Sequence, residues 1–526
     1  MKRSQRLIKL GLGMAFCGIL PLMAVSCGNR AGKSADSDSA AVADSVVKEP
    51  SRLPDTVMAS VDAINYKVEV LDSATDGRLE SLRDLYAEAP GIMTFRGGPQ
   101  RNAPYTGELK SAPSKIEVAW RFRTGADAKW GGGSGWTGQP VYVKWPEKMA
   151  AEMKSKGAVN ANFRGEEIIV GSLDGNVYFI DPQSGQATRE KIRSGNPIKG
   201  SVSLDPTLNG YLYVGQGIPN ERPFGAQTID LKNNSIVSTF DMDPKAQRAW
   251  GAYDSSALRV GQFVFRPGEN GTLYKWLPTA DGIRLHSTLR FTRGGGAPGI
   301  ESSIAVWSNY GYFCDNAGNV VCVNLDTMKP VWHYDNHDDS DSSPIVIPEG
   351  GHPYVYTASE IDRQGTGFGY FVKLDGLTGL PVWEAKIDGK RYDSTDNKKH
   401  FDGGFYATPL PGRADCEGIL FAPVVYNLRG QNGGIIAIDT KTGKTLWSTD
   451  LKAYPWSSPV ALTTPDGKMW IFAGDTAGNG YVINGKTGDI VATAPIGNNF
   501  ESSPIVIGNS LYVGSRGDTI FKITIS

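Results

Sequence analysis

The chain has few of the side chains that usually hold transition metals, with five His and five Cys in 526 residues. So few imidazoles argue against a His-rich metal centre. No Cys-x-x-Cys-His occurs, which removes the usual haem attachment site, and no two cysteines are adjacent. The formal net charge is −1 and no segment forms a basic stripe, so we expect no nucleic-acid partner.

Long apolar runs are missing everywhere except at the N-terminus. Basic residues at positions 2–9 precede an apolar stretch, residues 10–25, that contains Gly and is short for a membrane span. It ends in Ala24-Val25-Ser26-Cys27, and small residues before a Cys are typical of a bacterial lipoprotein signal. We therefore expect residues 1–26 to be cleaved as a signal peptide and Cys27 to carry lipid. The membrane partner would then be the outer membrane, on its periplasmic side or at the cell surface.

Two segments separate this signal from the main body. Residues 27–54 are rich in Ser, Ala, Asp and Lys and have almost no large apolar side chain, so we expect a flexible tether. Residues 55–115 form an N-terminal extension. Within it, residues 76–88 carry apolar side chains at helical spacing, which predicts a short amphipathic helix against the main body: Leu79, Leu82, Leu85 and Tyr86.

From residue 116 to the C-terminus the sequence indicates strands and turns alone, and one pattern recurs. Residues 434–447 show it best: a short apolar strand, Asp439, a turn containing Gly443, and a strand carrying Trp447. Related copies surround Asp181, Asp326, Asp375 and Asn484. Gly supplies a positive φ cheaply in such a hairpin turn. A repeat of this size, made of strands and turns, is typical of stacked β-blades.

A second recurring pattern marks where each blade begins, clearest at Asp341-Ser342-Ser343-Pro344 and Glu501-Ser502-Ser503-Pro504. Weaker copies bring the total to eight, which gives units of about 50 residues, the size of a four-stranded blade. We predict an all-β, eight-bladed propeller over residues 116–526, with seven blades as the alternative. The last unit lacks a fourth strand, and residues 117–125 can supply it, which would close the ring and remove an exposed sheet edge.

Four tryptophans occupy the fourth-strand position of their blades, where a large flat side chain can wedge one blade against the next: Trp120, Trp332, Trp383 and Trp447. Among the cysteines, Cys314 and Cys322 flank a tight turn and could pair, although two buried free thiols are the favoured interpretation. The loop 333–341 collects His, Asp and Asn side chains. It lacks the Gly and distal Glu of a Ca²⁺ loop, so we interpret it as solvated and assign no metal.

An acidic residue begins four of the eight blades, and blade starts line the central channel of a propeller. We therefore predict carboxylates around one mouth of the channel at Asp254, Glu301, Asp341 and Glu501, with Trp136 and Trp456 at or beside the same position in other blades. Gathered there, they could attract a cation or a basic partner. The simpler interpretation is that each carboxylate accepts backbone N–H bonds where its own strand begins.

These repeats resemble the PQQ-like repeat, the blade unit of quinoprotein propellers and of BamB-type outer-membrane lipoproteins. Residues 95–107, which include Arg96 and Gly97, are similar to the Arg-Gly segment that often precedes such domains. The resemblance implies a monomeric, non-catalytic lipoprotein scaffold that binds another envelope protein or a ligand, without a cofactor. One alternative is an oxidoreductase using pyrroloquinoline quinone (PQQ) with Ca²⁺, although the adjacent cysteines usual in such enzymes are missing. A second alternative is a glycan-binding or glycan-cleaving propeller.

Overall fold

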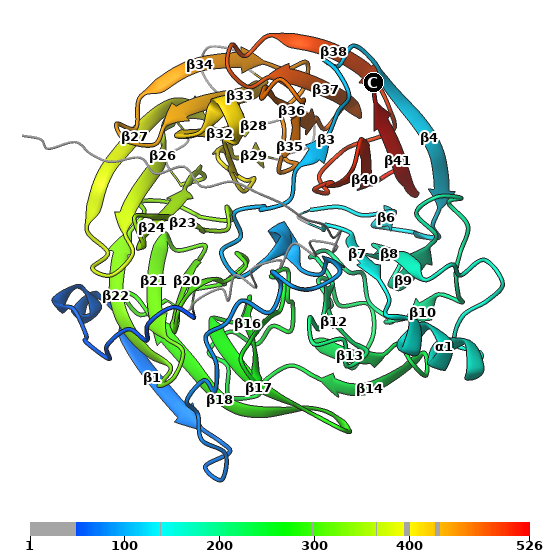
Figure 1. Ribbon diagram of the computed structural model, residues 1–526. Helices are drawn as coiled ribbons and strands as arrows, with labels where there is room; N and C mark the ends of the chain where they lie inside the picture. Colours follow the sequence, from blue (N-terminus) through cyan, green and yellow to red (C-terminus); the bar gives the residue numbers. More distant parts are fainter. Residues whose placement is uncertain (1–48, 137, 297, 364–365, 394–399, 427–431) are drawn as a thin grey trace, which may run out of the picture. The chain divides into compact units, whose positions relative to one another are not determined.

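Eight antiparallel sheets surround a central axis in the computed structural model, which describes residues 49–136, 138–296, 298–363, 366–393, 400–426 and 432–526 (Figure 1). The fold is therefore the eight-bladed propeller predicted from the repeats, and the seven-bladed alternative is wrong. All eight predicted blade starts precede an innermost strand. Because strands alternate in direction within a blade, the turn between third and fourth strands lies at the opposite end from the blade start.

The blades follow one another in chain order around the ring. Blade 1 contains β7 (Val141–Lys144), β8 (Glu166–Gly171), β9 (Asn176–Ile180) and β10 (Ile192–Arg193), and blade 2 contains β11 (Ser203–Leu204), β12 (Tyr211–Gly215), β13 (Ala226–Asp230) and β14 (Ser235–Phe240). Blade 3 contains β15 (Leu258–Val260), β16 (Phe263–Gly268), β17 (Thr272–Thr279) and β18 (Gly282–Thr292), and blade 4 contains β19 (Ala305–Trp307), β20 (Tyr310–Cys314), β21 (Asn319–Asn324) and β22 (Lys329–Asp335).

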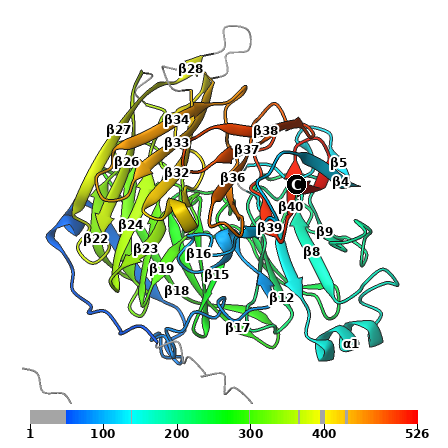
Figure 2. The same cartoon turned by 45° about the horizontal axis from the view of Figure 1, so that its top comes forward.

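Blade 5 contains β23 (Ile345–Glu349), β24 (His352–Ala358), β26 (Thr366–Asp375) and β27 (Pro381–Lys390). Blade 6 contains β31 (Leu410–Pro411), β32 (Ile419–Val425), β33 (Gly433–Asp439) and β34 (Thr445–Asp450), and its sheet also includes β25 (Glu360–Ile361) and β30 (Gly403–Gly404). Blade 7 contains β35 (Val460–Thr463), β36 (Met469–Gly474), β37 (Asn479–Asn484) and β38 (Ile490–Pro495), and blade 8 contains β39 (Ile505–Ile507), β40 (Ser510–Ser515) and β41 (Thr519–Ile525). Short pairs join β5 (Ala126–Asp127) to β6 (Gly131–Gly132) and β28 (Tyr392–Asp393) to β29 (His400–Phe401). In Figure 2, β27 and β28 project beyond the neighbouring blades.

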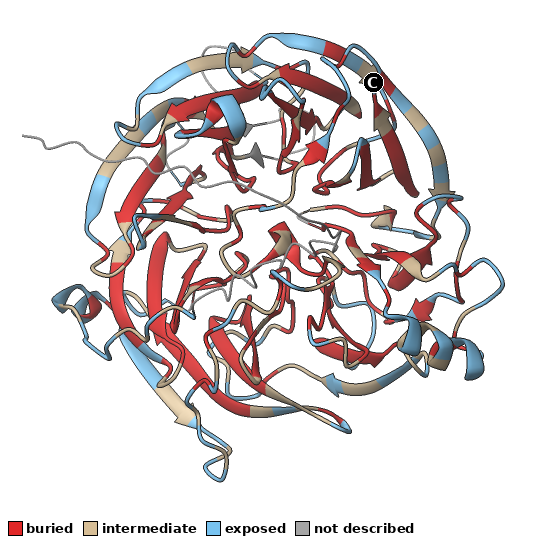
Figure 3. Cartoon of the chain, viewed as in Figure 1, coloured by how far each residue is buried: buried red, intermediate tan, exposed pale blue. Residues whose placement is uncertain are grey.

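The ring is closed by a strand from the start of the propeller. β4 (Ile116–Arg123) pairs antiparallel with β41 and becomes the fourth strand of blade 8. The predicted closure is confirmed, and the first and last segments of the propeller share one sheet. Inner strands are buried, and exposure concentrates on the outermost strands (Figure 3).

Each fourth-strand tryptophan reaches the next blade. The indole Nε1 of Trp332 donates to the Gly376 carbonyl at 3.0 Å, and that of Trp383 donates to the Thr440 carbonyl at 2.9 Å. Trp120 and Trp447 make the same contact with Pro182 and Gly485. A Cβ added at Gly379 would lie 2.6 Å from the Trp332 ring, and this glycine also has φ +73°. The turn therefore needs Gly both for its backbone and for the tryptophan of the preceding blade.

The serines of the blade starts join neighbouring blades around the axis. The N–H of Ser256 donates to Ser303 Oγ at 2.8 Å, and the N–H of Ser303 donates to Ser343 Oγ at 2.9 Å. The same bond links Thr408 to Ser458. A hydroxyl in this place satisfies a buried backbone donor that no strand partner can reach, which explains why Ser recurs at this position.

The N-terminal extension is part of the propeller surface. β1 (Asn65–Val70) adds to the outer edge of blade 3, and β2 (Gly91–Ile92) and β3 (Gly107–Glu108) add to the innermost strands of blades 1 and 7. A short 3₁₀ helix, η1 (Ala59–Ala63), precedes β1, and a second, η2 (Phe95–Gly97), lies between β2 and β3. The end of the expected tether is also attached, because the N–H of Leu53 donates to Asn309 Oδ1 at 2.7 Å.

The helix predicted over residues 76–88 is wrong: the segment is a series of turns and extended residues. Its N–H groups are taken by side chains of the propeller. Leu79 donates to Asp326 Oδ1 at 2.8 Å and Glu80 donates to Gln262 Oε1 at 2.9 Å. Three of its apolar side chains are nevertheless buried: Leu79, Leu82 and Tyr86. The helical spacing indicated correctly that these side chains are buried. Acceptors on the propeller take the N–H groups that would otherwise form helical hydrogen bonds.

A helix occurs instead inside the propeller, where the sequence had indicated strands and turns alone. α1 (Glu147–Ser155) connects β7 to β8 in blade 1 and buries Met153. Pro146 immediately before it and Glu147 in its first turn are ordinary helix-start signals. No helix among the described residues is long and apolar enough to cross a membrane.

Candidate functional site

One end of the central channel is filled by the N-terminal extension, which crosses the middle of the ring (Figure 1). Arg96 is fully buried and donates to the carbonyls of Pro459 (2.7 Å) and Pro409 (3.0 Å), which belong to blades 7 and 6. Arg101, also fully buried, donates to the Ile304 carbonyl at 2.9 Å on blade 4. Burial lowers the pKa of each guanidinium to about 10. Arg101 also donates to the Ser256 carbonyl at 3.2 Å on blade 3, so the two arginines bind four blades.

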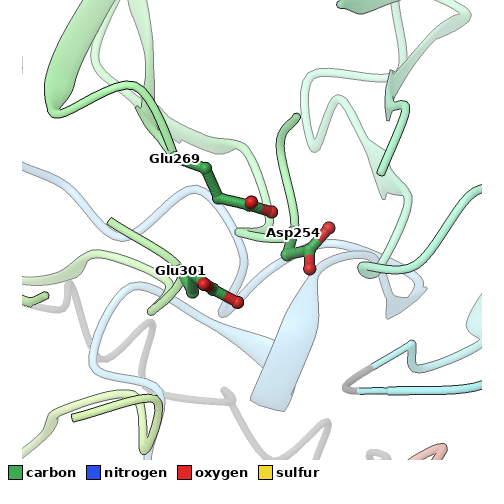
Figure 4. Close-up of side chains that lie close together, drawn as sticks. All are labelled: Asp254, Glu269 and Glu301. Carbon is green, nitrogen blue, oxygen red and sulfur yellow. The ribbon is translucent and has the colours of Figure 1, made fainter. Parts of the chain in front are cut away.

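The opposite end, where the blades begin, carries carboxylates. Asp254 precedes β15, Glu269 follows β16 and Glu301 precedes β19, and their side chains converge in Figure 4. One ligand oxygen from each lies within 4.8 Å of the others. Asp254 Oδ1 and Glu269 Oε1 are buried without a hydrogen-bond partner. We call these three residues the Lys199 cluster, because Lys199 forms ion pairs with two of them.

Lys199 supplies the cation for this cluster. Its Nζ forms an ion pair with Asp254 and lies 3.7 Å from Glu269 Oε1. Burial works to lower the pKa of Lys199, but the surrounding carboxylates outweigh it and the pKa is raised. Burial and the Glu269 charge raise the pKa of Asp254, although Lys199 opposes this. The cluster therefore contains its own counter-charge.

Glu501 is held in a second neutralised group beside the first. Arg516 Nη1 lies 3.2 Å from Glu501 Oε1, and the N–H of Trp136 donates to Glu501 Oε2 at 3.0 Å. The Trp136 ring has Arg516 at 4.7 Å and Lys199 Nζ at 4.9 Å from its centre. An unbroken series of contacts thus connects Glu501 to Asp254 across Trp136.

A second trio of carboxylates forms no ion pair with a Lys, Arg or His side chain among the described residues. Asp339 and Asp341 lie in the loop between β22 and β23, and Glu360 begins β25. One oxygen from each lies within 4.8 Å of the others. We call these residues the Glu360 cluster. Burial and Asp341 raise the pKa of Glu360, and burial together with Glu301 raises the pKa of Asp339 to about 8.

Aromatic side chains complete the mouth. Trp456 packs on Tyr406 with ring centres 5.0 Å apart, and the Tyr406 hydroxyl donates to the Asp402 carbonyl at 2.6 Å. Burial, followed by the charge of Glu360, raises the pKa of Tyr406. Tyr454 has its pKa raised to about 12 by burial and by Glu501. The mouth therefore contains carboxylates, the cations Lys199 and Arg516, and four aromatic side chains: Trp136, Tyr406, Tyr454 and Trp456.

The structure brings the four predicted acidic positions to one end of the channel and divides them into two kinds. Asp254 and Glu501 are paired with cations, whereas Glu301 and Asp341 have no ion pair in the described part of the chain. Sequence reasoning missed three residues of the mouth, Lys199, Glu269 and Glu360, and it had placed Asp339 in a loop interpreted as solvated. Two strands, β23 and β24, separate Glu360 from Asp341, so no local spacing could have revealed it.

The loop 333–341 differs from the solvated loop expected. Asn336, Asp338 and Ser340 are buried, and Asp338 accepts weak bonds from the N–H groups of residues 362 and 363. Cys314, Cys322 and Cys416 are buried free thiols, as favoured. The predicted lipid site, Cys27, lies outside the described residues.

Comparison with known proteins supports the repeat assignment. A family model described as outer membrane protein assembly factor BamB matches residues 431–526. Tetrathionate hydrolase of Acidianus ambivalens is 24% identical over 294 residues, 45% of this chain and 52% of that protein. The chain therefore spans about half the length of that curated relative.

Two solved structures share the fold. A europium-containing methanol dehydrogenase has a TM-score of 0.59 at 14% identity, covering 84% of this chain and 99% of its own. BamB from Moraxella catarrhalis has a TM-score of 0.51 at 15% identity, covering 78% and 100%. Similarity at this level establishes architecture, and the pair includes both a dehydrogenase and an assembly factor. Taken with the repeats and the eight blades, these matches support a PQQ-like repeat β-propeller, and the structural similarity establishes the fold.

Proposed function

We propose that this protein is a non-catalytic, lipid-anchored envelope scaffold whose channel mouth binds a basic segment of another envelope protein. Participation in outer-membrane protein assembly, in the manner of the BamB family, is the specific form of the proposal. The predicted signal at residues 1–27 supports the anchor, and the match of residues 431–526 to the BamB model supports the cellular setting.

The observation that carries the proposal is the difference between the ends of the channel. Arg96 and Arg101 belong to the N-terminal extension that crosses the ring, and they donate to backbone carbonyls of several blades. The other end gathers seven carboxylates, Asp254, Glu269, Glu301, Asp339, Asp341, Glu360 and Glu501, against Lys199 and Arg516. Burial and mutual repulsion favour the neutral forms of several of these carboxylates, and the Lys or Arg side chains of a partner would favour their ionised forms and pair with them.

The test compares capture by the parent and by a double variant, Glu301→Gln with Asp341→Asn. These two carboxylates form no ion pair in the described residues, so their loss leaves Lys199 and Arg516 paired. The control variant neutralises four exposed carboxylates at the opposite end: Glu108, Glu417, Asp466 and Asp489. We expect an envelope protein to be retained by the parent and the control and lost by the double variant, with salt weakening the capture. Equal capture by all three would contradict the proposal.

The quinoprotein alternative fits the mouth poorly. PQQ is itself a polycarboxylate, and the carboxylates here outnumber the cationic side chains. An acidic quinone would be repelled unless a cation lay between them. We therefore expect calorimetry to detect no PQQ binding in the presence of Ca²⁺, and no dye-linked oxidation of alcohols or sugars. Saturable binding with turnover would replace the scaffold proposal with an oxidoreductase.

The glycan alternative has less support, because the tryptophan rings of the mouth already contact other side chains. Sugar rings stack on open aromatic faces, but the Trp136 ring already contacts Arg516 and Lys199, and Trp456 packs on Tyr406. No specific feature of the mouth favours this alternative over binding of a basic protein segment.

A further inference from the structure

The fourth strands of blades 3 to 7 carry a bulge at the same place. In each blade, the residue immediately before the position that Trp332 holds in blade 4 has no partner on the third strand. It lies close to the turn between the third and fourth strands, at the end opposite the mouth. The bulged residues are His286, Val331, Val382, Leu446 and Val491. The repeat therefore places these side chains at one level of the ring, on its outermost strands.

The N-terminal extension covers this position in two of the blades. In blade 4, the N–H of Met58 donates to the Val331 carbonyl at 2.7 Å, and Val331 is only 1% exposed. In blade 3, His286 Nε2 lies 3.1 Å from the Thr75 carbonyl oxygen, and this side chain is also buried. Val331 shows that an apolar residue at the bulge suits a surface that something else covers.

In blades 5 to 7 the same position is apolar and open to solvent. The fold does not require a large apolar side chain there, because Ala119 holds the equivalent bulge in blade 8. The three blades are in contact at this level: the Trp383 ring lies 2.7 Å from a Cβ added at Gly443, and the Trp447 ring lies 2.7 Å from one added at Gly488. We call the exposed apolar side chains at and beside the three bulges the apolar arc: Leu380 (67% exposed), Val382 (49%), Leu446 (50%), Ile490 (40%) and Val491 (38%).

Lysines flank the apolar arc. The turns of blades 6 and 7 expose Lys441, Lys444 and Lys486. Two carboxylates, Asp439 and Asp489, share these turns, and that of Asp439 accepts the N–H groups of its own turn, from Lys441 at 3.1 Å and from Thr442 at 2.8 Å. On an anionic bilayer, apolar side chains enter the boundary between headgroups and acyl chains while ammonium groups meet the phosphates. The composition of the arc fits such a surface.

The described chain begins at this same end of the propeller. The Glu49 carboxylate accepts the N–H of Leu82, and Arg52 pairs with Asp326, in the turn between β21 and β22. Residues 28–48 separate Glu49 from the predicted lipid site, Cys27, and span at most about 70 Å when fully extended. A tether of this length keeps the propeller close to the membrane without fixing its orientation. Contacts made by the propeller surface must supply the orientation.

We propose that the apolar arc rests on an anionic phospholipid surface, the leaflet that holds Cys27, and that this contact turns the acidic mouth away from the membrane. The inference rests on the lipid anchor of the proposed function and adds the orientation of the propeller. Apolar side chains alone would suit a protein partner equally well. The lysines beside them and the start of the chain at the same end favour lipid.

The test uses the full-length protein reconstituted in vesicles of phosphatidylethanolamine and phosphatidylglycerol. An environment-sensitive fluorophore is attached at Leu446→Cys or at a matched control, Phe368→Cys, on β26 towards the mouth, where the phenylalanine is 38% exposed. The label falls on the new thiol because Cys314, Cys322 and Cys416 are buried. We expect brominated lipids to quench the label at position 446 by about half and the label at position 368 by less than about a tenth. Adding Leu380→Ser, Val382→Ser and Ile490→Ser should reduce the quenching at position 446 by about threefold.

Vesicle flotation separates failure of the docking from failure of the anchor. Protein that floats with the vesicles but shows equal quenching at the two positions, or unchanged quenching in the triple variant, would overturn the docking and leave the anchor intact. Protein that does not float would overturn both. A blue shift at position 446 that grows with protein concentration and that brominated lipids do not quench would assign the arc to a second copy of the chain. The melting temperature of the triple variant should match that of the parent, because the replaced side chains are exposed.

Discussion

The two ends of the central channel solve the problem of buried charge in opposite ways. At the plugged end, Arg96 and Arg101 are completely buried and every bond they make goes to a carbonyl or hydroxyl oxygen. At the open end, carboxylates face one another and only some of them meet a cation. In the plug, the guanidinium groups of Arg96 and Arg101 hold the blades together through hydrogen bonds. In the mouth, Glu301 and Asp341 form no ion pair among the described residues, as expected of a surface that binds a ligand or partner.

Removing β4 should have the largest effect, because both ends depend on a closed ring. Deletion of residues 116–125 would take away the fourth strand of blade 8 and expose the edge of β41. We expect aggregation and loss of the cooperative melting transition, measured by light scattering and differential scanning calorimetry. A monomeric product with the parent's melting temperature would contradict the closure.

The plug should respond next. Arg101→Met removes bonds to Ile304 on one side and to Phe95 on the other and leaves buried carbonyls unsatisfied. We expect a loss of about 2–4 kcal/mol in the free energy of unfolding. Denaturant unfolding measures it. Arg363→Met, at an exposed arginine near the mouth, is the matched control and should cost less than ~1 kcal/mol. Equal losses would remove the distinction between the two ends.

The mouth should behave in the opposite sense. Burial and neighbouring carboxylates raise the pKa of Asp341, Glu360 and Glu301, and raise that of Asp339 to about 8. Between pH 4 and 8 the folded protein keeps protons that the unfolded chain has lost, so these groups make stability fall as pH rises. In chelator, Asp341→Asn should flatten this fall and stabilise the protein by ~1 kcal/mol at pH 8. Identical pH profiles of parent and variant would contradict the account.

Changing the predicted lipid site should leave the propeller untouched. Cys27→Ser should abolish acyl labelling and release the protein from membranes, because the anchor is expected to be the lipid alone. The melting temperature should not change. Fractionation and metabolic labelling measure the outcome, and tight membrane association of the variant would indicate a second anchor.

Sequence patterns predicted the parts of the molecule that repeat. Trp332 and Gly379 recur in register, so both the blade count and the ring could be read from spacing. Features that occur only once could not be predicted from sequence patterns. The segment containing Leu79 has helical spacing but finds its acceptors on Asp326, far away in sequence. Glu360 joins Asp341 only because β25 pairs with β30, a contact that no local pattern specifies.

The predicted mouth shows the same limit within one motif. Asp254 and Glu301 occupy equivalent positions, and the repeat makes them equivalent in space. Their chemistry differs because Lys199, which lies outside the motif, pairs with Asp254. Position could therefore be predicted from the sequence, and charge state could not, because charge state depends on side chains contributed by other blades.

Site-specific photocrosslinking in cells can locate the face of the propeller that binds a partner. A photoreactive amino acid replaces Trp456, at the mouth, or Leu446, which is 50% exposed beside the Asp439 turn at the opposite end. We expect a crosslinked envelope protein from position 456 that disappears when Glu301→Gln and Asp341→Asn are added, and no such product from position 446. A crosslink from position 446 with none from position 456 would contradict the claim that the acidic mouth is the binding face.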